Sequence, residues 1–506
     1  MSTSLTTAKP EPATPPVPHR AVTAVVCIAL AAVVAAMSSL NVALPDIARS
    51  THADSTQLTW IVDAYSLFFA ALLLPAGALG DRFGRRLTLL VGLGIFGVGS
   101  AIAMTAGGAP ELIVLRAVLG LGAALVMPAT LSTITGTFSA AQRTKAVSIW
   151  AGVAGGSAVL GVLASGTLLE FWSWRSIFAL NVVLAAIAIV GTFRFVPESA
   201  DPNAPRLDVS GALLAVTGLF VLVYSIIEAP TYGWTAARTL GGLAIGLAVL
   251  AGFVLFERRT ANPLLNPRIF GHRGLAAGSM SIFVQFFAFY GFIFVVLQYL
   301  QLARGDSPLV SAVSMLPMAI TMMPTARLVP RLVSRVGAKV VCCTGLVLVA
   351  CGLFVIAQVD ASSPYWLLLC GLLPLGAGMG AAMTPATSAI TEALPAAQQG
   401  VGSAVNDLSR ELGGALGIAV VGSVLSSVYR SNFTMPHLSD VPSGAAAGLV
   451  EKAQGSYAIA AHIGGPVAQA GTSAFVDALH LALLICASAA LAAAVLVAVV
   501  LPKKGS

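Results

Sequence analysis

A few charged residues lie inside long apolar stretches of the sequence, where a charge is unusual. The five that we select as candidates are Asp63, Arg116, Asp407, Arg410 and Glu411. A charge in the interior of a bilayer is costly, and a carboxylate can lose its charge by accepting a proton. These five residues are therefore candidates for proton coupling or for pairing with a charged ligand.

Three of these residues have the spacing of one helix face. Arg410 follows Asp407 by three positions and Glu411 follows it by four, so an α-helix would place the three side chains on one side. If their span begins near Val401, they lie about 9–15 Å along it. Two carboxylates and one arginine leave one negative charge. The cluster is either a site for a proton or a cation, or a structural ion network that only locks helix packing.

No motif of an enzyme or of a nucleotide-driven pump is visible. The sequence has no phosphate-binding G-x-x-x-x-G-K-[ST] loop, no H-E-x-x-H pattern and no Cys/His group with metal-ligand spacing. Its six cysteines fall in apolar runs, where we expect them to act as small apolar residues. We therefore expect no catalytic residue, no metal and no cofactor, with an ion gradient as the energy source.

The elements that carry these charges are predicted to be membrane helices. The chain of 506 residues is 57% hydrophobic and only 9% charged, whereas about a quarter of the residues of soluble proteins are charged. We therefore predict an all-α, polytopic membrane protein. With about 20 apolar residues needed for each crossing, the sequence predicts fourteen spans: 21–43, 60–79, 87–106, 111–134, 145–168, 175–196, 209–228, 237–256, 273–300, 309–329, 338–358, 364–390, 401–428 and 475–501.

The charge of the loops predicts the orientation. Most of the 27 Lys and Arg residues fall in loops on one side of the spans, so both termini are expected in the cytoplasm. Because the basic residues follow the loops of one side, the net charge of +7 indicates membrane orientation rather than nucleic-acid binding. Residues 1–20 are expected to form a disordered cytoplasmic tail and 502–506 a short one. Residues 429–474 are expected to form the longest outside loop.

The two halves of the chain repeat each other. Gly120-Leu121-Gly122 with Pro128 in the fourth span recurs as Gly376-Ala377-Gly378 with Pro385 in the twelfth. This repeat predicts an N-terminal six-helix bundle at 21–196 and a C-terminal six-helix bundle at 273–501, with two inserted helices and their linkers at 197–272.

A charged, glycine-rich stretch separates the second span from the third. It reads Gly77-Ala78-Leu79-Gly80-Asp81-Arg82-Phe83-Gly84-Arg85-Arg86, and we expect it to form a tight turn in water. The pattern G-x-L-x-D-R-x-G-R-R resembles the loop 2–3 signature of the major facilitator superfamily. With fourteen spans, Asn41-Val42-Ala43-Leu44-Pro45 and Trp60-Ile61-Val62-Asp63-Ala64-Tyr65, the chain looks like the drug:proton antiporter-2 branch, the EmrB/QacA-type exporters.

The resemblance implies a major facilitator fold and proton-coupled efflux of small amphipathic drugs by alternating access. It implies a carboxylate at the cavity mouth at Asp63 and a proton-relay arginine at Arg116. The alternatives are a helix-start carboxylate and a cation that snorkels to an interface. The resemblance also implies a conformational gate of charge pairs and close glycines, formed by Gly77, Asp81, Arg82, Gly84, Arg85 and Arg86.

Two positions depart from the pattern of the branch. A carboxylate commonly stands five residues before Asn41, and here that residue is Ala36. The motif of the fifth span has lost its proline, which is Val162 here. Its small residues still permit close helix packing and are Ser157, Gly161 and Ser165. Without the first carboxylate, the first span has no charge that would select cations.

The expected partners are a small-molecule substrate, protons and the lipid bilayer. Gln285 in the ninth span is the residue that we expect to face the cavity. We expect a monomer in a bacterial-type cytoplasmic membrane that binds no nucleic acid. The alternatives to a multidrug exporter are a dedicated exporter of one metabolite or self-made antibiotic and a transport-dead membrane sensor or scaffold.

Overall fold

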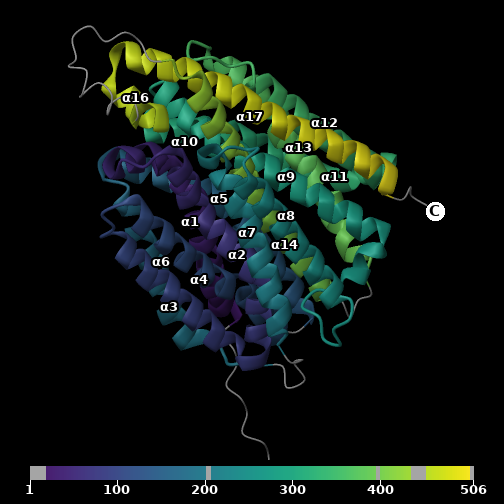
Figure 1. Cartoon of the computed structure of the whole chain (residues 1–506). Coiled ribbons are helices and arrows are strands. Elements are labelled where there is room, and N and C mark those ends of the chain that lie inside the picture. Colours follow the sequence, from purple (N-terminus) through teal and green to yellow (C-terminus); the bar gives the residue numbers. More distant parts are fainter. Residues whose placement is uncertain (1–18, 139, 201–206, 395–398, 435–451, 502–506) are drawn as a thin grey trace, which may run out of the picture.

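The computed structural model describes residues 19–138, 140–200, 207–394, 399–434 and 452–501, which are almost entirely helical and include no strand. The predicted tails at 1–18 and 502–506, and residues 435–451 of the predicted outside loop, lie outside the described residues. The helices are α1 (His19–Thr51), α2 (Ser55–Phe83), α3 (Arg85–Ala103), α4 (Ala109–Thr137), α5 (Ala140–Phe171), α6 (Arg175–Phe195), α7 (Val209–Tyr232), α8 (Ala237–Glu257), η1 (Pro267–Gly271), α9 (Arg273–Gln298), η2 (Tyr299–Ala303), α10 (Pro308–Ser314), α11 (Leu316–Val336), α12 (Ala338–Ile356), α13 (Tyr365–Glu392), α14 (Gln399–Asn432), α16 (Tyr457–Ile463) and α17 (Gly465–Val500) (Figure 1).

Fourteen helical segments in the described part are long and apolar enough to cross a membrane. This number confirms the predicted fourteen-span, all-α architecture. Helix α9 and η2 form one of these segments, and α10 and α11 form another. Helix α16 is too short to be a span.

Two predicted loops are shorter than expected. The glycine-rich stretch between the second and third spans is not a ten-residue turn, because α2 continues to Phe83 and α3 begins at Arg85. Only Gly84 leaves the helix, with a φ of 109° that strongly favours glycine. The predicted outside loop at 429–474 is also wrong at both ends, because α14 runs to Asn432 and α17 begins at Gly465.

The same pairs of helices pack together in both halves of the chain. In the first half α1 packs on α5, α2 on α4, and α3 on α4 and α6. In the second half α9 packs on α14, α11 on α13, and α12 on α13 and α17. The inserted helices α7 and α8 pack on each other, and α7 also contacts α2 and α14 (Figure 1). The weak repeat in the sequence thus corresponds to the same pattern of helix–helix contacts in each half.

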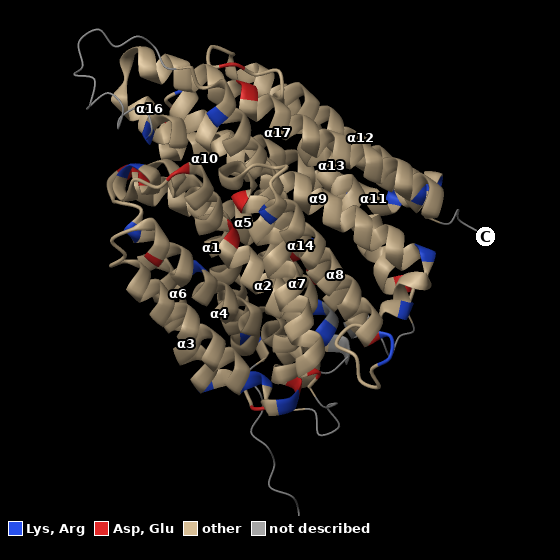
Figure 2. Ribbon diagram, in the orientation of Figure 1, with Lys and Arg blue, Asp and Glu red and all other residues tan. Residues whose placement is uncertain are grey.

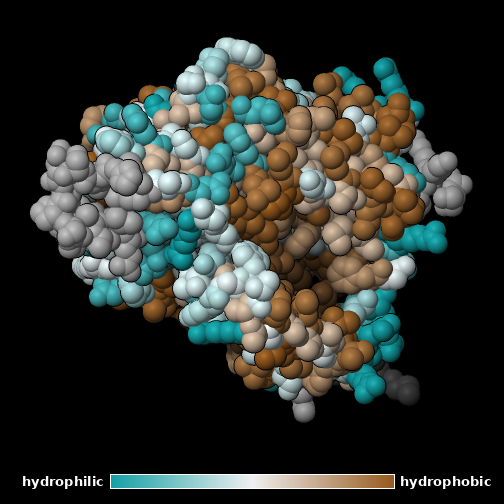
Figure 3. Space-filling model, turned by 45° about the horizontal axis from the view of Figure 1, so that its top comes forward, coloured by the Kyte–Doolittle hydropathy of each residue, from teal (hydrophilic) through white to brown (hydrophobic). Residues whose placement is uncertain are grey.

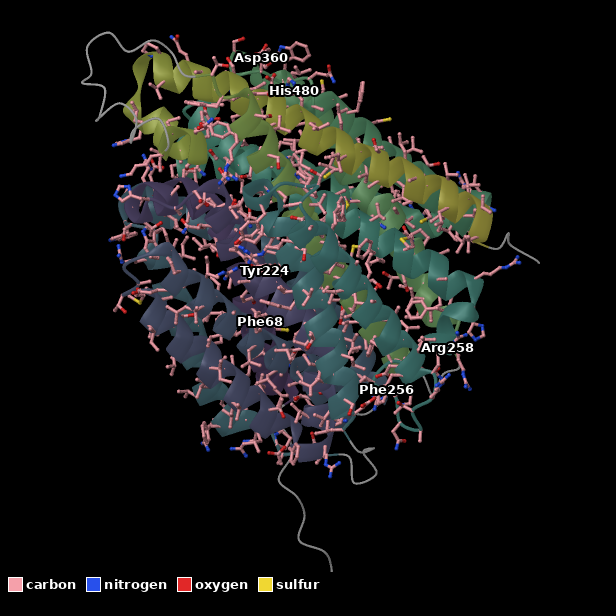
Figure 4. All side chains as sticks on the ribbon, viewed as in Figure 1. Phe68, Tyr224, Phe256, Arg258, Asp360 and His480 are labelled. Atoms are coloured by element: carbon pink, nitrogen blue, oxygen red, sulfur yellow. The ribbon has the colours of Figure 1, made fainter. Side chains whose placement is uncertain are left out.

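Charged residues gather toward the two ends of the helices, and the surface between them is broadly hydrophobic (Figures 2 and 3). Asp360 and His480 lie near one end, and Arg258 lies near the other (Figure 4). We call the end that carries Arg82, Arg86 and Arg258 the basic end, and the other the opposite end. From loop charge we expect the basic end to face the cytoplasm, and this orientation stays a prediction.

Hydrogen bonds and an ion pair join the two halves near the opposite end. The Gln301 side chain donates to the carbonyl of Val42 at 2.9 Å. The Ser55 hydroxyl donates to the carbonyl of Gly455 at 3.1 Å, and Arg430 pairs with Asp54 at 3.7 Å. The chain just before α16 is therefore held against the start of α2, which closes this end between the halves.

Candidate functional site

The charged cluster of α14 forms as its spacing predicts. Arg410 Nε lies 3.0 Å from Glu411 Oε1, and Arg410 Nη2 lies 3.7 Å from Asp407 Oδ1. Glu411 is 2% exposed, and its second carboxylate oxygen is buried with no hydrogen-bond partner in the described part. One arginine thus faces two carboxylates, and the Glu411 carboxylate can still accept a hydrogen bond at its second oxygen.

The cluster lies where the two halves meet. Arg410 Nη2 contacts the sulfur of Met127 on α4 at 3.6 Å, and the Arg410 guanidinium lies over the Phe286 ring at 5.8 Å. One turn further along α14, a Cβ added to Gly414 would lie 2.7 Å from the Tyr290 ring and 3.4 Å from the Met37 methyl group. Movement of one half against the other would therefore change the surroundings of this cluster.

Arg116 is held by backbone groups and an aromatic ring rather than by a carboxylate. Its Nε donates to the carbonyl of Ile61 at 3.0 Å, its Nη1 reaches the carbonyl of Ala36 at 3.5 Å, and its guanidinium lies 4.3 Å from the Tyr65 ring centre. The residue is 1% exposed, and its Nη2 has no hydrogen-bond partner among the described residues. The side chain therefore does not snorkel to an interface. The residue where the branch has a carboxylate, Ala36, stands directly beside it.

Asp63 is isolated. It is fully buried, and neither carboxylate oxygen has a hydrogen-bond partner in the described part of the chain. Helix α2 begins at Ser55 and is capped by Asp54 and Gln57. Because Asp63 lies more than two turns inside α2, it is not a helix-start carboxylate, and it forms no ion pair with Arg116.

Tyr65 packs against the Arg116 side chain. Its hydroxyl donates to the carbonyl of Val33 at 2.8 Å, and the centre of its ring lies 4.3 Å from the Arg116 guanidinium. In the sequence Tyr65 stands only as part of a motif, Tyr290 belongs to the aromatic run of the ninth span, and Met127 has no signal. An apolar or aromatic residue at a buried interface leaves no signal in one sequence.

The charged side chains of the gate make contacts within the first half. Asp81 pairs with Arg85 at 3.2 Å, Arg86 donates to the carbonyl of Phe193 at 2.9 Å, and Arg82 lies over the ring of Phe83. Gly77 has only an ordinary contact, with Pro128.

Glu198 was missed in the sequence. Its side chain accepts a hydrogen bond from the backbone N–H of Arg86, and it occupies the space where a Cβ of Gly84 would stand. The gate arginines are far from it in the sequence and its nearest basic residue is Arg194, so nothing in the sequence pointed to this contact.

The small residues of α5 lie along α1. A Cβ on Gly161 would come within 2.8 Å of the Ala35 backbone. The Ser165 hydroxyl donates to the carbonyl of Ser39 at 2.8 Å, whereas the Ser157 hydroxyl bonds within its own helix. The two backbones therefore approach closely despite the loss of the proline.

Gln285 is fully buried on α9 and presents no open surface. Its side-chain nitrogen donates to the backbone and hydroxyl oxygens of Ser281 at 3.1 and 3.0 Å. Its side-chain oxygen has no partner in the described part. Its predicted place on a cavity wall stays a prediction.

Comparisons with known proteins agree with this architecture. The family model "Major Facilitator Superfamily" matches residues 26–418. The chain is 36% identical to the multidrug resistance protein Stp of Mycobacterium tuberculosis over 67% of this chain and 63% of that protein, so it spans less than two thirds of this relative's length. It is 37% identical to the multidrug efflux pump LfrA of Mycolicibacterium smegmatis, over 68% of this chain and 69% of that protein. It is 35% identical to the tetracenomycin C resistance and export protein of Streptomyces glaucescens, over 68% of this chain and 66% of that protein.

Solved structures share the fold at low sequence identity. A bacterial homolog of the human lysosomal transporter Spinster, in an inward-facing conformation, aligns with a TM-score of 0.63 and 18% identity over 96% of this chain and 97% of that one. A D-xylose–proton symporter aligns with a TM-score of 0.60 and 16% identity over 96% and 99%. From the match of the family model, the fourteen spans and the repeated packing, the chain belongs to the Major Facilitator Superfamily.

Proposed function

We propose that the chain exports small amphipathic drugs or toxic compounds across the cytoplasmic membrane in exchange for protons. The observation that carries this proposal is the buried Asp407–Arg410–Glu411 cluster at the contact between the halves. A proton on Glu411 would weaken its pairing with Arg410, and a departing proton would restore that pairing. The names of Stp, LfrA and the tetracenomycin C exporter support export as the direction of transport.

Alternating access would expose this cluster to each side in turn. In this structure the opposite end is closed by the contacts of Gln301 and Ser55, while the side chains of Arg85 and Arg86 bond to Asp81 and Phe193 of the first half. Opening the opposite end requires these contacts to break. Rigid-body rocking of the two bundles would then carry substrate outward and a proton inward.

The chain also supports a narrower cargo as a second candidate. Arg116 lies beside Ala36 and has no carboxylate partner among the described residues. A buried positive charge of this kind disfavours cations nearby. This arrangement suits a dedicated exporter of one neutral or anionic metabolite or antibiotic.

A pH-gradient assay in inverted membrane vesicles tests the proposal. Ethidium, a quinolone and a tetracycline are added in turn to vesicles that carry the native chain, Asp407→Asn with Glu411→Gln, or Glu392→Gln as a control on the exposed end of α13. Antiport predicts that a substrate collapses the gradient in native and control vesicles and not in the double variant. Unchanged proton movement in the double variant would refute the proposed coupling.

A further inference from the structure

A cavity of about 340 Å³ lies between the first turns of α1, the end of α4 and the first turns of α5. Its walls are mostly apolar and include Ala24, Cys27 and Phe138, and the His19 ring packs edge-on against Phe138 at 4.8 Å. It lies at the basic end and involves no residue of the proposed transport site.

The rim of this cavity is basic. Arg20 and Lys145 stand on it, both exposed, and neither has an ion pair or hydrogen bond in the described part of the chain. None of the described residues that line the cavity is acidic. Two basic side chains without an acidic partner would attract an anionic lipid headgroup, and the apolar hollow beneath them would accept its acyl chain.

The seam between α1 and α5 carries hollows at two separate places. A second hollow of about 130 Å³ lies farther along the same two helices and is also lined by Leu184 of α6. The α1 residues of the two hollows include a series spaced three or four positions apart, which is Arg20, Ala24, Cys27, Ala31, Ala35 and Ser39. On α5 the same spacing occurs within each hollow, in Gln142, Ala146 and Ile149 and then in Ser157, Gly161 and Ala164, with a step of eight positions between the two sets. Each set therefore lies along one face of its helix.

The length of the seam suits one leaflet. Ten residues of helix rise about 15 Å, which is about half the hydrocarbon thickness of a bilayer. A chain that starts at Arg20 would thus end near Ala31, where the second hollow begins. Ala24 and Ala31 of α1 and Ala146 of α5 line this part of the seam with small side chains, before the two helices close on each other at Ala35 and Gly161.

We propose that this groove binds one anionic phospholipid from the cytoplasmic leaflet, with its phosphate between Arg20 and Lys145 and an acyl chain along the α1–α5 seam. The orientation required is the one that loop charge assigns. The site is independent of the transported compound and lies away from the charges of α14.

Native mass spectrometry of the purified full chain with added phosphatidylglycerol or phosphatidylcholine tests this site. We expect one phosphatidylglycerol to be retained per chain and to bind about 30-fold more weakly in Arg20→Gln/Lys145→Gln, which removes two basic contacts. Arg20→Lys/Lys145→Arg, which keeps both charges, should retain the lipid. Arg335→Gln/Lys339→Gln removes two charges at the basic end of the second half and should also retain it.

Ala24→Phe fills the hollow without changing any charge and should release the lipid as well. A melting measurement on each variant establishes that it is folded. Equal retention in all variants, or equal retention of phosphatidylcholine, would overturn the proposal. Lipid binding that appears only after deletion of residues 1–18 would overturn it too, because that segment would then be the occupant.

Discussion

At the scale of single residues, the proposed coupling depends on buried charged groups that lack some of their hydrogen-bond partners among the described residues. Glu411 and Arg410 form a close pair, and Asp63 is buried without a partner. Their spacing in helical runs was enough to predict that Asp407, Arg410 and Glu411 meet. The isolation of Asp63 could not be predicted, because it depends on where α2 begins and on which helices surround it.

We expect Glu411→Gln to lower proton-driven efflux more than tenfold, because the amide keeps the volume but cannot exchange a proton. A tenfold loss corresponds to about 1.4 kcal/mol. Efflux of ethidium from preloaded cells measures this, with Glu392→Gln as the matched control. Native-like efflux in Glu411→Gln would assign coupling to another carboxylate.

Ala36→Asp is expected to shift the substrate range toward cations. The new carboxylate would stand beside the Arg116 guanidinium, whose Nη1 lies 3.5 Å from the Ala36 carbonyl oxygen. It would neutralise a buried positive charge and remove its repulsion of cations. Resistance to ethidium relative to a neutral compound measures the shift, and Ala36→Asn controls for the added volume. An equal change in both variants would mean that volume, rather than charge, is responsible.

At the scale of elements, close approach of α1 and α5 depends on Gly161. A Cβ there would meet backbone atoms of Ala35 at 2.8 Å, which cannot move without shifting the helix. We expect Gly161→Ala to destabilise the protein by about 1–3 kcal/mol through overpacking. Gly156 lies in open space on the same helix, so Gly156→Ala should be neutral or slightly stabilising. Thermal melting in detergent compares them, and equal midpoints would refute a tight α1–α5 contact.

The sequence predicted which helices exist better than where they end. Runs of apolar residues marked all fourteen spans, because a bilayer demands that length. Helix ends depend on caps and on neighbours, so α2 extends through Asp81 and Arg82 to Phe83, and only the positive φ of Gly84 ends it. The sequence could not predict that Tyr65 and Tyr290 pack beside the buried charges. An aromatic residue inside an apolar helix carries no sign of which neighbour it contacts.

At the scale of the whole molecule, the repeat of packing pairs gives two bundles that can rock against each other. The contacts near α16 must break for the opposite end to open. A Cβ on Gly455 would lie 3.6 Å from the Cβ of Asp54, which is within the range of a disulfide.

We therefore expect Asp54→Cys/Gly455→Cys to lose efflux on oxidation and to regain it with reductant. Asp54→Cys alone shares the loss of the α2 cap and is the control. Full efflux in the cross-linked protein would show that this end does not need to open.

The measurement that tests the central claim most directly is proton release on substrate binding by the purified protein in weakly buffered solution. The account predicts that a transported compound releases protons from the native chain and none from Glu411→Gln, with binding still detectable by tryptophan fluorescence. Equal proton release from Glu411→Gln and the native chain would contradict it, because the exchanged proton would then not reside on Glu411.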